Sequence, residues 1–429
     1  QVSLVKDINT QPGSSSPTIS LQIGAVTYFT ATTYEYGNEL WRSDGTQDGT
    51  YMVKDINPGI NSSSVLQMKE MNGILFFIAT DGVHGNELWR SDGTEFGTYI
   101  IKDISPGSAS GTNGNNQELV VLNNKLFFIG NDGVNGNELW KSDGSEIGTL
   151  LVKDIFPGVS SGPYVNTIRD DNGIYSYKYF TIVGGKIFFK ARDGVNGIEL
   201  WVSDGTSTGT SLVKNINPGS GNGLSDDYPF FRFINVSDII YFKGNNGING
   251  DELWRSDGTE TGTFMVKDVQ PAGSAITGST EFANVNGTLF FSASNSNGIE
   301  LWKTDGTEAG TDLVKDIIAG TGSSYPSHLT AVGATLFFTA NDGVNGNELW
   351  KSDGSLGGTS MVTDFWPGSD SGNPANMVNI NGTLYFTASH YLVGKVLCKT
   401  DGTGPGTIML NDLYSGTDGA LIQFLANVG

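Results

Sequence analysis

One segment recurs along the whole chain and constrains its fold more than any other feature. It reads Glu-Leu-Trp-x-(Ser/Thr)-Asp-Gly-(Thr/Ser)-x-x-Gly-Thr, and its copies begin at Glu39, Glu87, Glu138, Glu199, Glu252, Glu300, Glu348 and, in degenerate form, Val396. Successive tryptophan positions are separated by 48, 51, 61, 53, 48, 48 and 48 residues, and Cys398 replaces the last tryptophan. A period in this range is typical of propellers, solenoids and arrays. We therefore expect residues 1–429 to form a single domain of eight repeats, each of about 48 residues.

Each repeat divides into four short segments that have the character of strands. In the seventh repeat they are His328–Val332, Leu336–Ala340, Glu348–Ser352 and Thr359–Phe365. The second segment is apolar on successive residues, as in ILFFIA and TLFFTA, so both faces of its sheet must be covered. Glycine- and asparagine-rich connections between the segments favour hairpins. The sequence therefore predicts an all-β fold, an eight-bladed β-propeller of four-stranded antiparallel blades.

The two ends of the chain complicate this scheme. Ser3–Ile8 resembles an additional fourth segment, and Leu421–Val428 resembles an additional first segment. The N-terminal segment could complete the blade that the eighth repeat begins. The eighth repeat's own fourth segment and the additional first segment would then be left over. They could start a further unit that this chain does not include, or the ring could be phased differently, and the sequence leaves both open.

The repeated box is interpreted as structural. Leu and Trp should project to opposite faces of the third strand and fill the gaps between blades, while Asp and Thr cap the following turn. The predicted core tryptophans are Trp41, Trp89, Trp140, Trp201, Trp254, Trp302 and Trp350. Cys398 should be a buried thiol, because it occupies the tryptophan position. The charged pairs Lys54-Asp55, Lys153-Asp154 and Lys315-Asp316 are expected to be solvated residues that protect an outer strand from aggregation.

A calcium loop is the competing interpretation of the box. Asp132, Glu138 and Asp143 supply hard oxygen atoms of the type that calcium prefers. Their spacing matches neither an EF-hand loop nor the nonapeptide calcium repeat, so we expect no metal and no cofactor.

The repeats differ mainly in the connection from the fourth segment to the next blade. The connections Pro157–Lys186 and Pro218–Asp238 are long and rich in aromatic and charged residues, and insertions at equivalent loops lie on one rim of an array. Such rings and charges can stack on a sugar or bind a protein, although they could equally form a small core on the rim. The candidate ligand-binding residues are Tyr164, Arg169, Asp170, Asp171, Tyr175, Tyr177, Asp226, Asp227, Tyr228, Phe230 and Arg232.

Composition narrows the classes of function. The net charge of −21 disfavours binding to nucleic acid or to anionic membranes. A single cysteine and three histidines leave little for a disulfide or a multi-histidine metal site. No apolar run is long enough to cross a bilayer. The adjacent pair Asp170-Asp171 could in principle act on a glycoside, but no catalytic motif occurs in a matching context, so we expect no catalytic residues.

The boxes ELWRSDGT, ELWKSDGS, ELWVSDGT and ELWKTDGT, together with the following GT and VKDI-PG, resemble the ELWxxDGT repeat family of secreted and cell-surface proteins, found especially in Bacteroidetes. The resemblance spans essentially the whole chain. It implies a secreted or extracellular cell-surface protein, often a cargo of the type IX secretion system with a C-terminal sorting domain. The final box, VLCKTDGT, departs from the pattern, and the family supplies no catalytic residues to transfer.

We therefore expect a non-enzymatic exported adhesin or binding module. Its partners would be secretion-system or other cell-surface proteins, or glycans, and the family resemblance suggests a link to gliding motility. The alternatives are a passive display scaffold that needs no ligand and a polysaccharide-acting enzyme.

Overall fold

The computed structural model describes residues 4–112, 118–164, 166–169, 175–178, 180–225, 233–271, 273–278 and 280–410. Regular structure within these ranges consists of β-strands. None of the described residues forms a helix long and apolar enough to span a membrane. The prediction of an all-β fold is confirmed.

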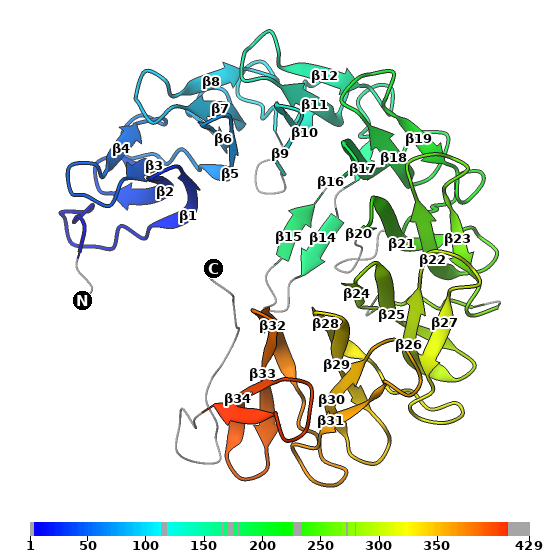
Figure 1. Ribbon diagram of the computed structural model, residues 1–429. Coiled ribbons are helices and arrows are strands. Elements are labelled where there is room, and N and C mark those ends of the chain that lie inside the picture. The colour runs from blue at the N-terminus through cyan, green and yellow to red at the C-terminus, as the bar shows by residue number, and fades with distance from the viewer. Residues whose placement is uncertain are drawn as a thin grey trace. The chain divides into compact units, whose positions relative to one another are not determined.

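The chain divides into two compact units, which are described separately (Figure 1). The first unit comprises Gln1–Val165, Tyr177–Asn215 and Gly219–Gly221. Its first two sheets contain β1 (Thr18–Ile23), β2 (Val26–Thr33), β3 (Gly37–Ser43) and β4 (Tyr51–Lys54), then β5 (Leu66–Met71), β6 (Ile74–Ala79), β7 (Glu87–Ser91) and β8 (Tyr99–Lys102). Its third and fourth sheets contain β9 (Val120–Leu122), β10 (Lys125–Asn131), β11 (Asn137–Ser142) and β12 (Leu150–Lys153), then β16 (Thr181–Val183), β17 (Lys186–Ala191), β18 (Glu199–Ser203) and β19 (Ser211–Lys214).

The long fourth connection adds three short strands. Strand β13 (Pro163–Tyr164) pairs with β17, so the fourth sheet gains a fifth strand. Strands β14 (Asn166–Arg169) and β15 (Tyr175–Lys178) form a separate two-stranded sheet.

The second unit comprises Asn166–Ser176, Ile216–Pro218 and Asn222–Gly429. Its first two sheets contain β20 (Ile234–Val236), β21 (Ile239–Asn245), β22 (Asp251–Ser256) and β23 (Phe264–Lys267), then β24 (Phe282–Val285), β25 (Thr288–Asn295), β26 (Gly298–Thr304) and β27 (Asp312–Lys315). Its last two sheets contain β28 (Ser327–Val332), β29 (Thr335–Asn341), β30 (Asn347–Ser352) and β31 (Ser360–Thr363), then β32 (Ala375–Ile380), β33 (Thr383–His390), β34 (Gly394–Thr400) and β35 (Ile408–Leu410).

Each repeat thus forms one antiparallel meander, and the described residues make eight of them. This fold is consistent with an eight-bladed propeller. The expectation of one domain over residues 1–429 stays a prediction.

Apolar faces hold neighbouring sheets together within each unit. The second strand of a sheet is buried along its length, as in β6, where Leu75, Phe76, Phe77, Ile78 and Ala79 are at most 2% exposed. In the second sheet, Leu88 packs with residues of the third sheet and Trp89 packs with residues of the first. The prediction that Leu and Trp face opposite neighbours is confirmed. The burial of Cys398 at the tryptophan position is confirmed as well, and burial raises the pKa of its thiol to about 12.

A β-bulge recurs between the third and fourth strands. In the first sheet Leu40 pairs with Lys54 while Trp41 pairs with Met52, so Val53 is the extra residue. Val53 is buried at 3% exposure, and the adjacent Lys54 is only half-buried. A bulge re-aims the side chains that follow it, so the outer strand can contribute both an apolar side chain to the core and a lysine to the next sheet.

That lysine corrects one expectation. The Nζ atom of Lys54 donates to the carbonyl oxygen of Thr98 at 2.8 Å, and Lys315 donates to that of Thr359 at 2.9 Å. Lys315 also lies over the ring of Trp350, with its Nζ atom 5.6 Å from the ring centroid. The bulge turns the lysine side chains toward the next sheet. The lysines are therefore half-buried and donate hydrogen bonds to that sheet, and they are not solvated edge charges.

The two chain ends also differ from the scheme. The eighth meander is completed by its own fourth strand, β35, so it does not need the N-terminal segment. Residues 4–8 form no strand, yet Lys6 donates to the carbonyl oxygen of Thr50 at 2.6 Å, which is the same tie that Lys54 makes to the second sheet. The N-terminal segment therefore lies where the outer strand of a preceding sheet would lie. Leu421–Val428 falls outside the described residues.

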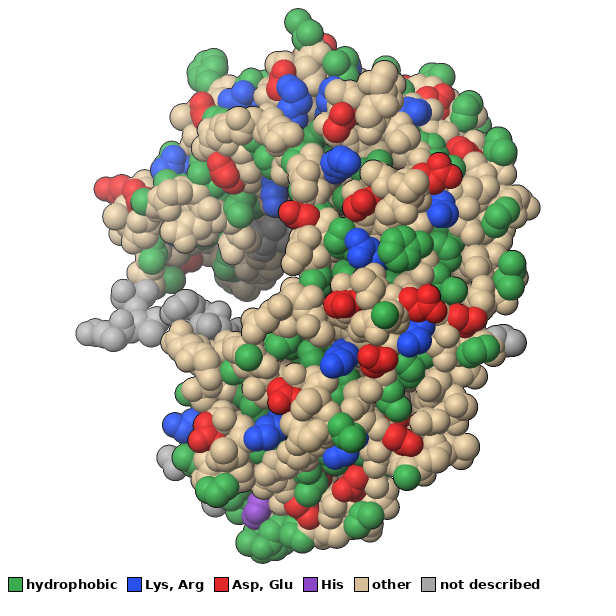
Figure 2. Space-filling model, turned by 45° about the vertical axis from the view of Figure 1, so that its right-hand side comes forward, with side chains coloured by type: hydrophobic (Ala, Val, Ile, Leu, Met, Phe, Trp, Pro, Cys, Tyr) green, Lys and Arg blue, Asp and Glu red, His purple; other side chains and the backbone are tan. Residues whose placement is uncertain are grey.

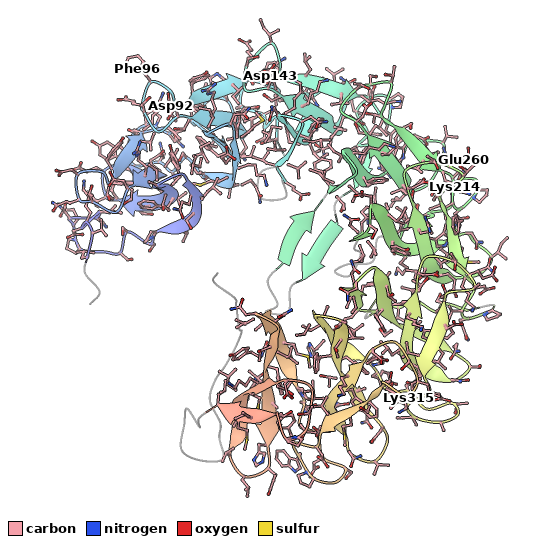
Figure 3. The ribbon with its side chains drawn as sticks, in the orientation of Figure 1. Asp92, Phe96, Asp143, Lys214, Glu260 and Lys315 are labelled. Carbon is pink, nitrogen blue, oxygen red and sulfur yellow. The ribbon has the colours of Figure 1, made fainter. Side chains whose placement is uncertain are left out.

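Truncation of a core tryptophan should test this packing. We expect Trp140→Ala, at a side chain only 6% exposed, to lower the free energy of unfolding by about 3 to 5 kcal/mol. The matched control is Phe96→Ala, because Phe96 is 98% exposed at a loop tip (Figure 3). Chemical denaturation of both variants would measure the difference, and equal midpoints would contradict the proposed role of the box.

Candidate functional site

The Asp-Gly-Thr turn of the box is closed by its own hydrogen bonds. In the second repeat Asp92 Oδ1 accepts from the amide and the hydroxyl of Thr94, at 2.9 and 2.7 Å. The hydroxyl of Thr94 in turn accepts from the amide of Gly97 at 3.0 Å. A Cβ atom at Gly97 would collide with the Asp92 carboxylate, so the second glycine of the box is required by this close approach. The prediction that Asp and Thr cap the turn is confirmed.

The glutamate of the box has a role that the sequence analysis did not identify. Glu39 is fully buried, and its carboxylate accepts hydrogen bonds from the amides of Ile56, Asn57 and Ser63 at 3.0, 3.4 and 3.0 Å. These donors belong to the connection that leads from β4 toward β5. One carboxylate therefore shapes a connection that lies 17 to 24 residues downstream. The signal in the sequence was the invariable glutamate before Leu-Trp in seven copies.

The calcium interpretation is not supported by the geometry. Asp132 accepts from the amides of Val134 and Asn135, in the turn before β11, and Asp143 accepts from Ser145, in the turn after it. The six-residue strand between them spans roughly 20 Å at about 3.3 Å per residue. Glu138 is fully buried within that strand. Among the described residues, no group of three or more His, Cys, Asp or Glu side chains is placed to hold a metal ion.

The structure describes only part of the two long connections, Pro157–Lys186 and Pro218–Asp238, that carry the candidate ligand-binding residues. Tyr164, Arg169, Tyr175 and Tyr177 lie in β13, β14 and β15, but their side chains are outside the described part of the structure. The remaining candidates lie wholly outside the described residues, and they are Asp170, Asp171, Asp226, Asp227, Tyr228, Phe230 and Arg232. The predicted ligand-binding role of these residues stays a prediction.

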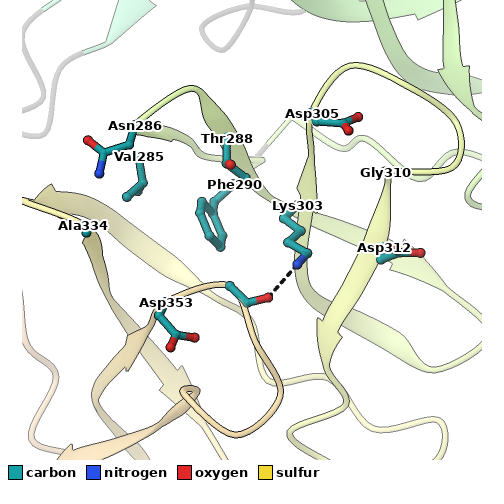
Figure 4. A pocket seen from close by; sticks show the side chains of 11 residues that line it. Val285, Asn286, Thr288, Phe290, Lys303, Asp305, Gly310, Asp312, Ala334 and Asp353 are labelled. Atoms are coloured by element: carbon teal, nitrogen blue, oxygen red, sulfur yellow. Dashed lines mark hydrogen bonds between the residues drawn. The ribbon is translucent and has the colours of Figure 1, made fainter.

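A groove in the second unit is the strongest candidate site among the described residues. It lies between the sheets β24–β27 and β28–β31 and has a volume of about 430 Å³ (Figure 4). The buried side chains of Phe290 and Val285 form its base, and Lys303 crosses it to donate to the carbonyl oxygen of Gly354 at 2.8 Å. Three exposed carboxylates line it, those of Asp305, Asp312 and Asp353.

The groove is lined by smaller residues than the preceding sheet has at the equivalent positions. In the preceding sheet the corresponding residues are Tyr241, Arg255 and Phe264, and the Arg255 guanidinium lies 5.2 Å from the centre of the Phe264 ring. Arg42 and Arg90 stack in the same way on Tyr51 and Tyr99. In the groove, Lys303 replaces the arginine and Asp312 replaces the ring. The substitution removes the stacked pair and adds a negative charge.

Two carboxylates of the groove, those of Asp305 and Asp353, have lowered pKa values. Hydrogen bonds from the Thr307 hydroxyl and amide lower the pKa of Asp305, and those from Ser355 lower the pKa of Asp353. These bonds occupy the Oδ1 atom of each residue. Asp312 lies 3.9 Å from Lys267 Nζ. With three carboxylates and one lysine, the lining carries a net negative charge.

Charge elsewhere on the surface is mixed. On the face that Figure 2 shows, acidic and basic side chains are interspersed rather than gathered into one patch. Surface charge alone therefore does not mark a second site on that face.

The comparisons with known proteins assign no family. No family model matches the sequence, and no curated protein matches it. Among solved structures, a puromycin hydrolase has 14% identity and a TM-score of 0.32, covering 88% of this chain and 58% of its own. A structure from a study of two prolyl endopeptidases has 12% identity and a TM-score of 0.36, covering 81% of this chain and 49% of its own. The chain thus spans about half to three-fifths of the length of these proteins, and their activities are not transferred.

A calcium titration should test the assignment of the turn carboxylates. Because Asp132, Glu138 and Asp143 bond to backbone and side-chain donors in separate places, we expect the melting temperature to be the same in millimolar calcium and in excess chelator. Differential scanning fluorimetry would measure both conditions. A calcium-dependent rise in melting temperature that is lost in Asp132→Asn would contradict the assignment.

Proposed function

We propose that this chain is a non-enzymatic, exported binding module of the cell surface, and that the groove between β24–β27 and β28–β31 is a binding site. The family resemblance of the repeated box motivates the exported location and the cell-surface partners. The groove motivates the binding role. In three other sheets the corresponding positions hold a stacked Arg–aromatic pair, whereas Lys303 and Asp312 take these positions here and line the groove.

The lining suggests the chemistry of the ligand. Carboxylates accept hydrogen bonds and carry negative charge, so the groove should favour a ligand rich in hydroxyl groups or carrying a protonated amine. Val285 and Phe290 lie beneath this polar lining and are only 7% and 2% exposed, so the polar groups dominate the contact with a ligand. A glycan that contains amino sugars has both kinds of group, whereas an anionic polysaccharide would be repelled.

The carboxyl groups of the structure favour binding over acid–base catalysis. Asp305 and Asp353, two exposed aspartates of the groove, have lowered pKa values, which makes them weak bases near neutral pH. The glutamates of the box have raised pKa values, but they are fully buried and their oxygen atoms accept bonds from backbone amides. Neither group combines access to a ligand with a pKa suited to proton transfer.

A groove-filling variant should test the proposed site. Phe290→Tyr, Lys303→Arg and Asp312→Phe together would rebuild the arrangement of Tyr241, Arg255 and Phe264, which the chain already tolerates in its neighbouring sheet. We expect the native protein to bind on a glycan array that includes amino-sugar polymers, and the variant to lose at least tenfold in affinity. Calorimetric titration with the best array ligand would measure the loss.

The matched control is Lys351→Arg with Ser360→Phe, which introduces the arginine and the ring at the equivalent positions one sheet later and leaves the groove open. We expect it to bind as the native protein does. Equal loss of binding in both variants would contradict the proposed site. Absence of binding by the native protein to glycans and to cell-surface proteins would favour a display scaffold, and release of shortened glycans would favour an enzyme.

A further inference from the structure

A pocket in the first unit lies between the N-terminal segment and the turn that joins β2 to β3. Its volume is about 190 Å³, and residues 8–11 and 33–36 line it together with Trp41 and Met52. Trp41 is buried, whereas Tyr34 and Tyr36 are 76% and 38% exposed. The pocket therefore combines a buried apolar part with exposed aromatic rings.

Glycine occupies the position of Tyr34 in five other repeats. These glycines are Gly82, Gly133, Gly194, Gly247 and Gly343, and their φ angles lie between 78° and 84°. At Gly82 a Cβ atom would lie 2.7 Å from Oδ1 of Asn57, the residue that corresponds to Asn9 of the N-terminal segment. The glycine thus allows the turn to lie directly against the connection, and its positive φ favours glycine as well. Tyr34 does not have a positive φ, so the first repeat forms a different turn.

The polar groups of the usual turn are occupied within the turn. In the third repeat Asp132 Oδ1 accepts from the amides of Val134 and Asn135 at 2.9 and 2.8 Å, and its Oδ2 accepts from the Asn135 side chain at 2.7 Å. In the first repeat Thr33 has the position of that aspartate, and its hydroxyl accepts from the amide of Tyr36 at 3.2 Å. Among the described residues, one side-chain hydrogen bond of this kind takes the place of three.

The N-terminal segment differs from the other connections in the same way. Asn57 Nδ2 donates to the carbonyl oxygen of Ser62 at 3.0 Å, so that amide is engaged within its own connection. The side chains of Asn9 and Gln11 line the pocket and form no hydrogen bond with another described residue. Asn9 is half-buried and Gln11 is exposed. Their amide groups are thus available to a ligand.

Charge and size restrict the class of ligand. No lysine or arginine lines the pocket, so an anion has no partner there. Glu35 is the one carboxylate among the lining residues, and it is exposed, so water and salt screen its attraction for a cation. The volume is below the roughly 300 to 1,000 Å³ of sites for drug-sized ligands, which favours a single ring over a chain. Amide groups both donate and accept hydrogen bonds, as the hydroxyl groups of a sugar do.

We propose that this pocket is a second binding site of the chain, and that it takes one uncharged sugar residue at the end of a glycan. The rings of Tyr34 and Tyr36 pack on the apolar face of the sugar, and the amides of Asn9 and Gln11 bind its hydroxyl groups. The site is separate from the groove of the second unit and does not rest on the function proposed for that groove. The two sites differ in charge, so they select different sugars.

Installing the turn of the third repeat should close the pocket. The variant carries Thr33→Asp, Tyr34→Gly, Glu35→Val and Tyr36→Asn, which is the sequence that the chain already has at 132–135. The probes are neutral oligosaccharides of glucose, mannose and galactose, observed by saturation-transfer difference NMR. We expect the native protein to bind one of them with a dissociation constant of about 1 mM, since a single sugar makes few contacts. The turn variant should lose at least fivefold in saturation transfer.

The matched control makes the same replacement in the eighth repeat, which also has a tyrosine at this position. It carries His390→Asp, Tyr391→Gly, Leu392→Val and Val393→Asn, and it should keep the native signal. A further variant, Asn9→Ala with Gln11→Ala, leaves the turn unchanged and should weaken the signal at least threefold. Melting temperatures would show that each variant is folded.

The groove-filling variant, with Phe290→Tyr, Lys303→Arg and Asp312→Phe, separates the two sites. It should bind neutral sugars as the native protein does, and a loss of the signal there would place the ligand in the groove and overturn this proposal. Absence of transfer to every neutral sugar, a signal confined to amino sugars, or a full signal in the Asn9→Ala, Gln11→Ala variant would overturn it as well. Neutral-sugar binding without any binding at the groove would support the pocket and contradict the groove.

Discussion

Each sheet of this chain has two apolar faces, and covering them is the constraint on which the rest of the structure depends. Leu88 and Trp89 are adjacent in sequence, yet they pack against different neighbouring sheets. A single strand therefore joins three sheets. Because no sheet can cover both faces alone, stability depends on neighbours, as it does in other repeat proteins. The first sheet has a neighbour of this kind at its N-terminal side. Residues 4–8 form no strand there, but Lys6 donates a hydrogen bond to the carbonyl oxygen of Thr50.

Polar groups then determine how the sheets are joined. The bulge before Lys54 turns its ammonium group toward Thr98 in the next sheet, and the buried Glu39 holds the connection that leads away from the same strand. Both interactions use backbone atoms as partners, so they tolerate changes in neighbouring side chains. The connections can consequently differ in length and sequence while their starting points remain alike.

This division of roles explains where a binding site can arise. Residues of the box form the turns and the core. Asp92, for example, caps a turn, and the side chain of Trp140 is buried in the core. The variable positions lie between the sheets, at the first residue of the outer strand. Phe264 fills that position in one sheet, and Asp312 opens it in the next. A few substitutions between neighbouring repeats thus distinguish a packed seam from an acidic groove.

The sequence by itself determined the four strands of each repeat, their order and the main residues of the core. The period of the box and the apolar second segments allow few other folds, because a strand apolar on both faces must lie between two layers. Asp and Thr could be assigned to turns because their partners are two or three residues away. Tertiary structure alone decided the roles of Glu39, Lys54 and Lys303. Their partners lie 17 to 51 residues away, and charge and composition do not reveal contacts at that separation.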